Sequence, residues 1–160
     1  MPPMDAGLFT LKLCTALGCG LVAGVFFAFS TFVMRALGQQ PPAQGIATMQ
    51  AINITAINPW FMGALFGTGL ACLGLIIAVL ANRNQPGAGY LLTGSLLYLV
   101  GTILVTIAVN VPLNDALAVV KPDSTEGATL WANYLTIWTF WNHVRTVAAL
   151  GAAVLLSITR

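Results

Sequence analysis

The side chains best suited to chemistry gather in one stretch of the chain, between residues 131 and 145. At about 100° of rotation per residue, a helix would place its aromatic and polar members on a single stripe together with Leu135: Trp131, Tyr134, Trp138, Trp141, Asn142 and Arg145. An aromatic wall beside amide and guanidinium donors suits a flat, partly polar aromatic ligand. Tryptophans also form belts at membrane interfaces, so a purely interfacial role for the aromatic members stays open.

Arg145 is the sharpest single feature of this stripe, because an apolar run over residues 147–156 follows it closely. An arginine near the centre of a bilayer costs about 2.5–3.5 kcal/mol on insertion scales, so it normally faces the helix bundle and has a partner. One interpretation is a cation directed at a bound anionic or enolate-like ligand. The other is structural: the guanidinium is tied to carbonyls or asparagines of a neighbouring helix, or extends to the interface.

His143 is the only histidine of the chain, and the helical wheel places it roughly 120° or more away from Trp138 and Arg145. One histidine cannot build a zinc site or a non-haem iron triad within one chain, because those sites need two or three such ligands. Three roles therefore remain open for it: a structural residue, a general base, or the axial ligand of a haem.

A second polar group lies at the ends of neighbouring apolar segments, on one side of the predicted membrane: Asn53, Asn58, Asn110, Asn114 and Asp115. The pattern Asn110-Val-Pro-Leu-Asn114 is typical of a helix stop with two polar caps. Broken helices at membrane depth also line ligand sites, so both interpretations stand. Asp115 would act as a base, pair with Arg145, or be a solvated loop acid.

The elements that must position these residues follow from the composition. The 160 residues are 58% hydrophobic and only 6% charged, whereas soluble domains are about 25% charged. So few charges cannot cover a water-facing surface, and a net charge of +2 indicates no nucleic-acid partner. We therefore predict an all-α, membrane-embedded four-helix bundle that contacts the lipid bilayer and forms one domain over residues 1–160.

Four apolar stretches are long enough to span a bilayer, which takes about 20 residues: residues 8–36, 60–81, 88–109 and 131–158. The first is too long for the core of a signal peptide and lacks a basic cluster at its start, so we expect it to be retained. Between the first and second stretches, residues 41–57 are less apolar but repeat at helical spacing, which predicts a short interfacial helix in the first loop.

The boundaries of these stretches carry recognisable signals. Asn58-Pro59 is typical of a capped helix start, and residues 82–87 form a short polar turn. Pro112 predicts that the third helix bends or stops near Asn110. Residues 123–126 predict a capping box at the start of the fourth helix.

Small residues and charges complete the prediction of the assembly and its orientation. Glycines four residues apart, at 20 and 24 and at 63 and 67, favour close helix packing and allow a homo-oligomer through these faces. Lys12, Arg83 and Arg160 flank one side of the membrane, against Arg35 and Lys121 on the other. We expect a multi-pass protein of a bacterial inner membrane, and the positive-inside rule predicts that both of its termini lie in the cytoplasm.

Several strings together resemble the anthrone oxygenase-like family of small integral membrane proteins, most of whose members have no known function. They are Gly24-Val-Phe-Phe-Ala-Phe-Ser-Thr-Phe-Val-Met34, Met49-Gln-Ala-Ile-Asn53, Asn110-Val-Pro-Leu-Asn114 and Trp138-x-x-Trp-Asn-His-Val-Arg145. The resemblance implies oxidation of a flat hydrophobic phenol or anthrone by molecular oxygen, without a bound flavin or metal. We expect no cofactor, with haem or a quinone as alternatives.

The resemblance and the residue types together assign roles. The candidate catalytic residues are Arg145, Asn142, His143, Asn110 and Asn114, which would stabilise developing charge or, for His143, act as a base. The candidate substrate-binding residues are Trp138, Trp141, Tyr134, Asn53 and Asn58. Two other functions compete with an oxygenase: a lipophile-binding or transport module without catalysis, and a structural membrane subunit.

Overall fold

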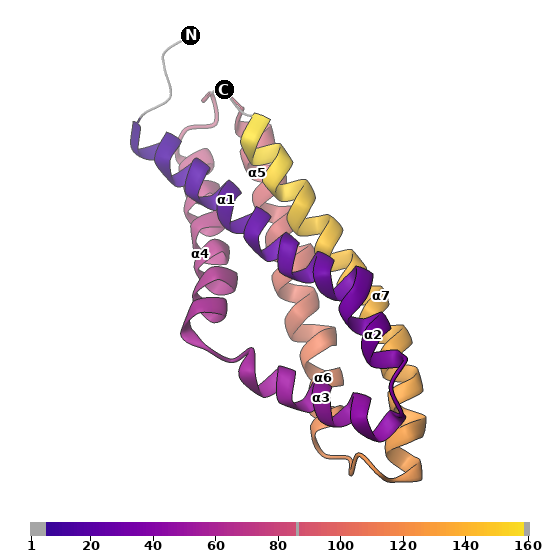
Figure 1. Cartoon of the computed structure of the whole chain (residues 1–160). Coiled ribbons are helices and arrows are strands. Elements are labelled where there is room, and N and C mark those ends of the chain that lie inside the picture. Colours follow the sequence, from indigo (N-terminus) through magenta and orange to yellow (C-terminus); the bar gives the residue numbers. More distant parts are fainter. Residues whose placement is uncertain (1–5, 86, 159–160) are drawn as a thin grey trace.

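The computed structural model describes residues 6–85 and 87–158, and its regular elements over these ranges are all helical (Figure 1). In chain order the helices, with η for π-helical turns, are α1 (Ala6–Ala28), η1 (Phe29–Val33), α2 (Met34–Gly38), α3 (Pro42–Thr55), α4 (Pro59–Ala81), α5 (Ala88–Tyr98), η2 (Leu99–Leu104), η3 (Thr106–Asn110), α6 (Val111–Ala118) and α7 (Thr125–Ile158). The prediction of an all-α fold is confirmed.

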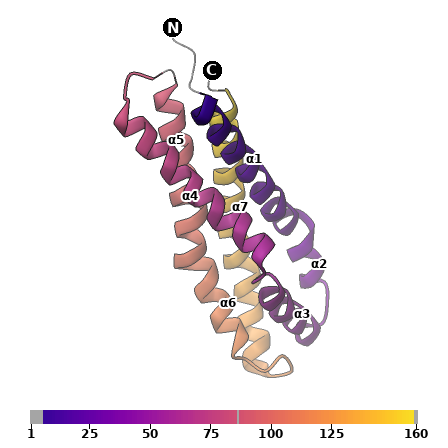
Figure 2. The ribbon, with the colours of Figure 1, turned by 90° about the vertical axis from the view of Figure 1, so that its left-hand side faces the viewer.

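Four continuous helices are long and apolar enough to cross a membrane, as predicted. They cover Ala6–Gly38, Pro59–Ala81, Ala88–Ala118 and Thr125–Ile158. α1 packs along α7 and α4, and α5 packs along α4 and α7, so the four helices close a ring. Consecutive helices run antiparallel, and the ends of α1 and α7 that carry the labelled termini lie at the same end of the bundle (Figures 1 and 2).

The packed core has two parts that differ in chemistry. Towards the end with the termini the core is mainly aliphatic, and it includes Cys19, Leu75, Tyr98 and Ala149. Towards the other end, aromatic side chains of α7 meet α2, α3 and α6 around Trp131. The aromatic part of the stripe therefore serves as core for the lower half of the bundle.

α3 is the helix expected in the first loop, and it separates the start of α4 from the lower half of α7. Its buried face, with Gly45, Ile46 and Met49, packs onto α2, α6 and α7. A side chain at position 45 would meet the Trp131 ring at 2.9 Å, so glycine is needed for this close approach. Figure 1 shows α3 crossing the lower end of the bundle between α2 and the start of α4.

The third long helix does not stop near Asn110, so the stop that was one of the two outcomes expected from Pro112 does not occur. Helical structure continues through the proline to Ala118. Proline lacks an N–H and its ring clashes with the carbonyl four residues earlier. The chain accommodates this with the π turn η3, in which the Val111 N–H bonds to the Thr106 carbonyl, five residues back. The helix therefore extends beyond the predicted span of residues 88–109.

Two helix starts also show which side chains act as caps. The Asn58 Oδ1 accepts hydrogen bonds from the backbone N–H groups of Trp60 and Phe61, as the Asn-Pro signal predicts. The cap of α7 is Ser124, whose Oγ accepts from the Gly127 N–H at 2.9 Å. The predicted capping box is thus shifted by one residue, because α7 begins at Thr125.

The glycines that hold the helices together are not the ones that their spacing singled out. An added Cβ at Gly20, Gly24, Gly63 or Gly67 would meet nothing within 4 Å. A Cβ at Gly101 would instead lie 2.4 Å from the Ala148 Cβ. The faces with the glycines at spacing four point outward in the described chain, and their role in a homo-oligomer stays a prediction.

Two of the basic residues used to predict the membrane orientation do not lie at a described end of the bundle. Lys12 is 5% exposed, inside the bundle rather than at its rim, and its amine lies 5.0 Å from the centre of the Phe9 ring. Arg160 lies outside the described residues, as does Pro86 in the polar turn. Arg83, Arg35 and Lys121 are exposed near the ends of the bundle.

Candidate functional site

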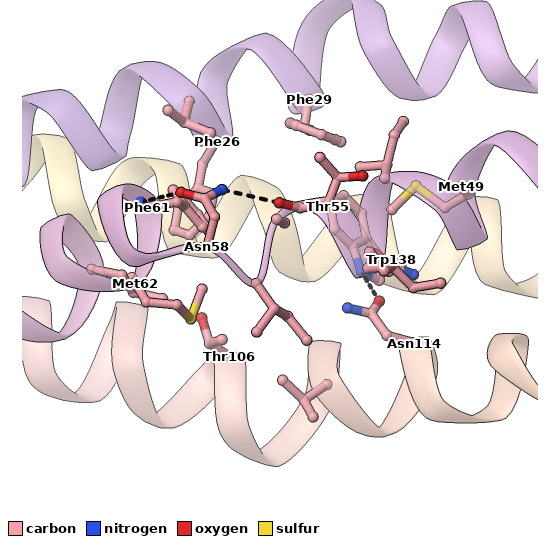
Figure 3. A pocket seen from close by; sticks show the side chains of 18 of the residues that line it. Phe26, Phe29, Met49, Thr55, Asn58, Phe61, Met62, Thr106, Asn114 and Trp138 are labelled. Carbon is pink, nitrogen blue, oxygen red and sulfur yellow. Dashed lines mark hydrogen bonds between the residues drawn. The ribbon is translucent and has the colours of Figure 1, made fainter.

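A cavity of about 720 Å³ lies in the lower half of the bundle, where α3 separates α4 from α7. Its walls come from α1, the end of α3 with the following linker, α4, η3 and α6, and α7. Most lining side chains are apolar, and Figure 3 shows Phe26 and Phe29 on one side with Met62 and Thr106 opposite. Ligand pockets commonly measure about 300–1,000 Å³, so a flat molecule of several fused rings fits this volume.

Arg145 is the cation of this cavity, and its surroundings are neutral. The guanidinium is 4% exposed; Nη1 donates to Thr106 Oγ1 at 3.2 Å and Nη2 donates to Asn142 Oδ1 at 2.7 Å. It also lies 4.2 Å from the centre of the Phe26 ring and 5.0 Å from that of Trp138. Its Nε finds no hydrogen-bond partner and no carboxylate pairs with it in the described part of the chain. A buried cation without a counter-ion attracts an anionic group to this cavity.

Asn142 does not line the cavity, but its side chain fixes the position of the Arg145 guanidinium through a hydrogen bond. Its Nδ2 donates to the Phe26 carbonyl and to Ser30 Oγ, both at 2.7 Å. These bonds direct its Oδ1 towards the guanidinium. Ser30 is in turn 3.1 Å from Thr146 Oγ1, so a polar chain links α1 to α7 beside the arginine.

The π turns place the partners of this network. A π turn includes one extra residue and widens the helix locally, and such turns are frequent at functional sites. η1 contains Ser30, and η3 contains Thr106 and Asn110, both buried. Ser30 and Thr106, the side chains that bond to Asn142 and Arg145 of α7, therefore both come from π turns.

The Trp138 side chain lines the cavity where α7 contacts α6. Its ring stacks on Tyr134 at 6.0 Å between centres, and Tyr134 stacks on Trp131 at 5.5 Å. The Trp138 Nε1 and the Tyr134 hydroxyl each donate to Asn114 Oδ1 at 2.8 Å. Phe29 tilts against Trp138 from α1, with ring centres 5.8 Å apart. The indole is thus fixed on three sides, with its ring at the cavity.

Five of the ten predicted site residues line the cavity: Arg145, Asn114, Trp138, Asn53 and Asn58. Among these, Asn58 has its side chain occupied as the α4 cap, because its Nδ2 also donates to the Thr55 carbonyl at 3.0 Å. Asp115, exposed, lies at the cavity as well. It makes no ion pair with Arg145, so the pairing considered from the sequence is not formed.

The other five predicted residues lie outside the cavity lining: Asn142, Asn110, Tyr134, Trp141 and His143. Asn142 and Tyr134 support lining residues, and the Asn110 Nδ2 donates to the Trp138 carbonyl at 3.2 Å. Trp141 is half-buried and packs edge-on against Phe140 at 5.6 Å. His143 is exposed on the outer face of α7, as the helical wheel indicated.

Sequence reasoning missed the contributions of Phe26, Ser30 and Thr106. Phe26 and Ser30 fall within the run from Gly24 to Met34 that supports the family resemblance, so that run held a usable signal. Thr106 lies in an apolar segment one turn before Asn110 and has no distinguishing neighbour in the sequence. Among the described residues, no group of three or more His, Cys, Asp or Glu side chains is placed to hold a metal ion.

Comparison with protein families shows which family the sequence matches. The family model described as anthrone oxygenase matches residues 58–155, more than half of the chain. The match covers α4 to most of α7, and so includes Thr106, Asn114, Trp138 and Arg145, but not α1 and α3. Neither curated proteins nor solved structures gave a significant match. The chain belongs to the anthrone oxygenase family.

Proposed function

We propose that this protein is a membrane oxygenase that converts a flat, hydrophobic anthrone-type phenol into a quinone with molecular oxygen. Family membership supports an oxygenase-like role. The observation that carries the proposal is Arg145, a buried cation with neutral partners at an aromatic-walled cavity. Such a site favours a planar molecule that becomes an anion during the reaction.

The reaction balances with oxygen as the sole oxidant. Loss of a proton from the anthrone methylene gives an enolate-like anion whose charge lies largely on the carbonyl oxygen. This electron-rich anion reduces molecular oxygen and forms a carbon–oxygen bond at the former methylene carbon, which gives a hydroperoxide. Loss of the remaining hydrogen on that carbon as a proton, with cleavage of the oxygen–oxygen bond, then yields the second carbonyl and releases the outer oxygen as one water molecule.

The residues of the cavity divide this work. Arg145 would stabilise the oxyanion, and Thr106 and Asn142 would keep the guanidinium in place. The rings of Trp138 and Phe26 would hold the fused rings of the substrate and exclude water. Asp115 is the carboxylate among the described lining residues, and it would accept the methylene proton.

The decisive experiment measures oxygen uptake by the purified protein in detergent with anthrone as substrate, and product formation by absorbance. Turnover is expected for the natural sequence. Arg145→Met has a similar length but no charge, and it should lower turnover roughly 10²- to 10³-fold, as for other lost oxyanion donors. Arg83→Gln, in the exposed turn after α4, is the matched control for loss of one positive charge and should leave turnover unchanged.

Three results would point elsewhere. Equal turnover in the Arg145→Met variant would remove the arginine from the mechanism. Thermal stabilisation by anthrone without oxygen uptake would favour a lipophile-binding module. A haem absorption band that disappears in His143→Ala would show a haem protein whose ligand lies on the outer face of α7.

A further inference from the structure

The side-chain amide of Asn114 has a fixed orientation. Its Oδ1 accepts two hydrogen bonds, from the Tyr134 hydroxyl and from the Trp138 Nε1, each at 2.8 Å. An indole N–H can only donate, so the atom that faces it must be the amide oxygen and not the amide nitrogen. The usual ambiguity between the two ends of an asparagine side chain is therefore resolved by its neighbours.

This orientation turns the Asn114 Nδ2 towards the cavity. Asn114 is half-buried and lines the cavity, and its Nδ2 makes no hydrogen bond within the described residues. Figure 3 shows the nitrogen pointing away from Trp138, into the space between the helices. Asn58 lines the same cavity, but its oxygen and its nitrogen both bond to backbone groups.

Two of the cavity's hydrogen-bond donors thus lie at separate places around one indole. Arg145 lies over the face of Trp138, whereas Asn114 lies at its Nε1 edge. The guanidinium carries a charge and the carboxamide does not. A ligand that satisfies both needs an anionic oxygen at one place and a neutral acceptor oxygen at the other.

We propose that Asn114 is a specificity-determining residue whose N–H groups bind a second oxygen of the ligand, which rests on the oxygenase function proposed above. The substrate class is therefore an anthrone-type ring system that carries a further oxygen substituent. A hydrocarbon group at that place would displace water from the Asn114 N–H groups without replacing its hydrogen bonds, which costs binding free energy. A site with such donors therefore discriminates against analogues that lack the bonded group.

The test uses pairs of ligands that differ in one acceptor oxygen. Methoxyanthrones and their ethyl counterparts, substituted at each ring position in turn, have nearly the same size. Binding is measured under argon by quenching of tryptophan fluorescence, so that it does not depend on turnover. At one ring position or more, the natural protein should bind the methoxy compound roughly threefold to tenfold more tightly, as for one net hydrogen bond.

Asn114→Asp sharpens the test, because the carboxylate still accepts from Tyr134 and Trp138 but places an oxygen where the N–H groups were. The preference should reverse in favour of the ethyl compound. Asn133→Asp is the matched control: Asn133 is exposed on α7 and does not line the cavity, so the same exchange of side chains should leave the methoxy preference intact. Thermal unfolding of each variant confirms that it is folded.

The outcomes separate this inference from the proposed function. Methoxy preference without any oxygen uptake would support the subsite and contradict the oxygenase. Normal oxygen uptake with no methoxy preference at any ring position would overturn the role of Asn114, even if the Asn114→Asp variant does not fold. Absence of binding by every anthrone would overturn both.

Discussion

Arg145 shows how a membrane protein can hold a charge without a counter-ion. Two neutral hydrogen-bond acceptors and two aromatic faces surround the guanidinium. Cation–π contacts contribute more when the cation is desolvated, about 2 kcal/mol or more. These contacts offset part of the cost of burial, but the unpaired Nε leaves one donor unsatisfied. The residue is therefore suited to function more than to stability.

This balance predicts an unusual effect of Arg145→Met on stability. Replacement of a buried ion pair by apolar side chains of similar volume is often neutral or stabilising by about 1–4 kcal/mol, and Arg145 has no carboxylate partner among the described residues that its removal would leave unpaired. We expect the thermal unfolding temperature of the variant in detergent to be at least that of the natural protein, while turnover is lost. Arg145→Lys should be less stable, since an ammonium cannot match the planar stacking and forked donation. A large loss of stability in Arg145→Met would show a structural role instead.

At the scale of elements, irregular helical turns and close glycine contacts set the geometry of the site. η1 and η3 bring Ser30 and Thr106 towards α7, and η2 carries Gly101 into direct contact with it. The cavity exists because α3 takes the place beside the lower half of α7 that α4 would otherwise occupy. Packing of α5 and η2 against α7 then determines how far η3 lies from Arg145.

Glycine substitutions test which helix contacts the fold depends on. Gly101→Ala would place its Cβ 2.4 Å from that of Ala148, which forces the helices apart and should cost about 1–3 kcal/mol, as other overpacked cores do. Gly67→Ala, which meets nothing within 4 Å, should be neutral or slightly stabilising, since alanine favours helix over glycine. Thermal unfolding of both variants in detergent measures the difference. Equal stability would contradict the packing of η2 on α7.

At the scale of the molecule, four crossings put the described ends of α1 and α7 on one side of the membrane. The polar turn after α4 shares that side, while α3 and the turn before α7 share the other. The cavity lies in the half of the bundle nearer the second side.

The positive-inside prediction of cytoplasmic termini can be tested with reporter fusions in a bacterial inner membrane. Alkaline phosphatase inserted between residues 119 and 124 should be active, because that turn is expected to face the periplasm. The same enzyme fused after the fourth helix should be inactive, and a fluorescent protein there should fluoresce. The opposite pattern would reverse the orientation and place the cavity near the cytoplasm.

The amino-acid sequence by itself determined the features that depend on local pattern. The long apolar stretches and the scarcity of charge dictate four spanning helices, because lipid leaves few other ways to satisfy the backbone. Helical spacing alone put Trp138, Asn142 and Arg145 on one face and His143 on another. The Asn58 cap is likewise local, since its bonds reach only two or three residues along the chain.

The tertiary structure decided what depends on contact between distant segments. Ser30 meets Asn142 across 112 positions of the chain, and Thr106 meets Arg145 across 39. No pattern within one helix specifies such pairs, because the rotation and axial shift of each helix come from packing against all the others. The same holds for the helix that continues past Pro112 and for Asn114, whose amide direction is set by two side chains of α7.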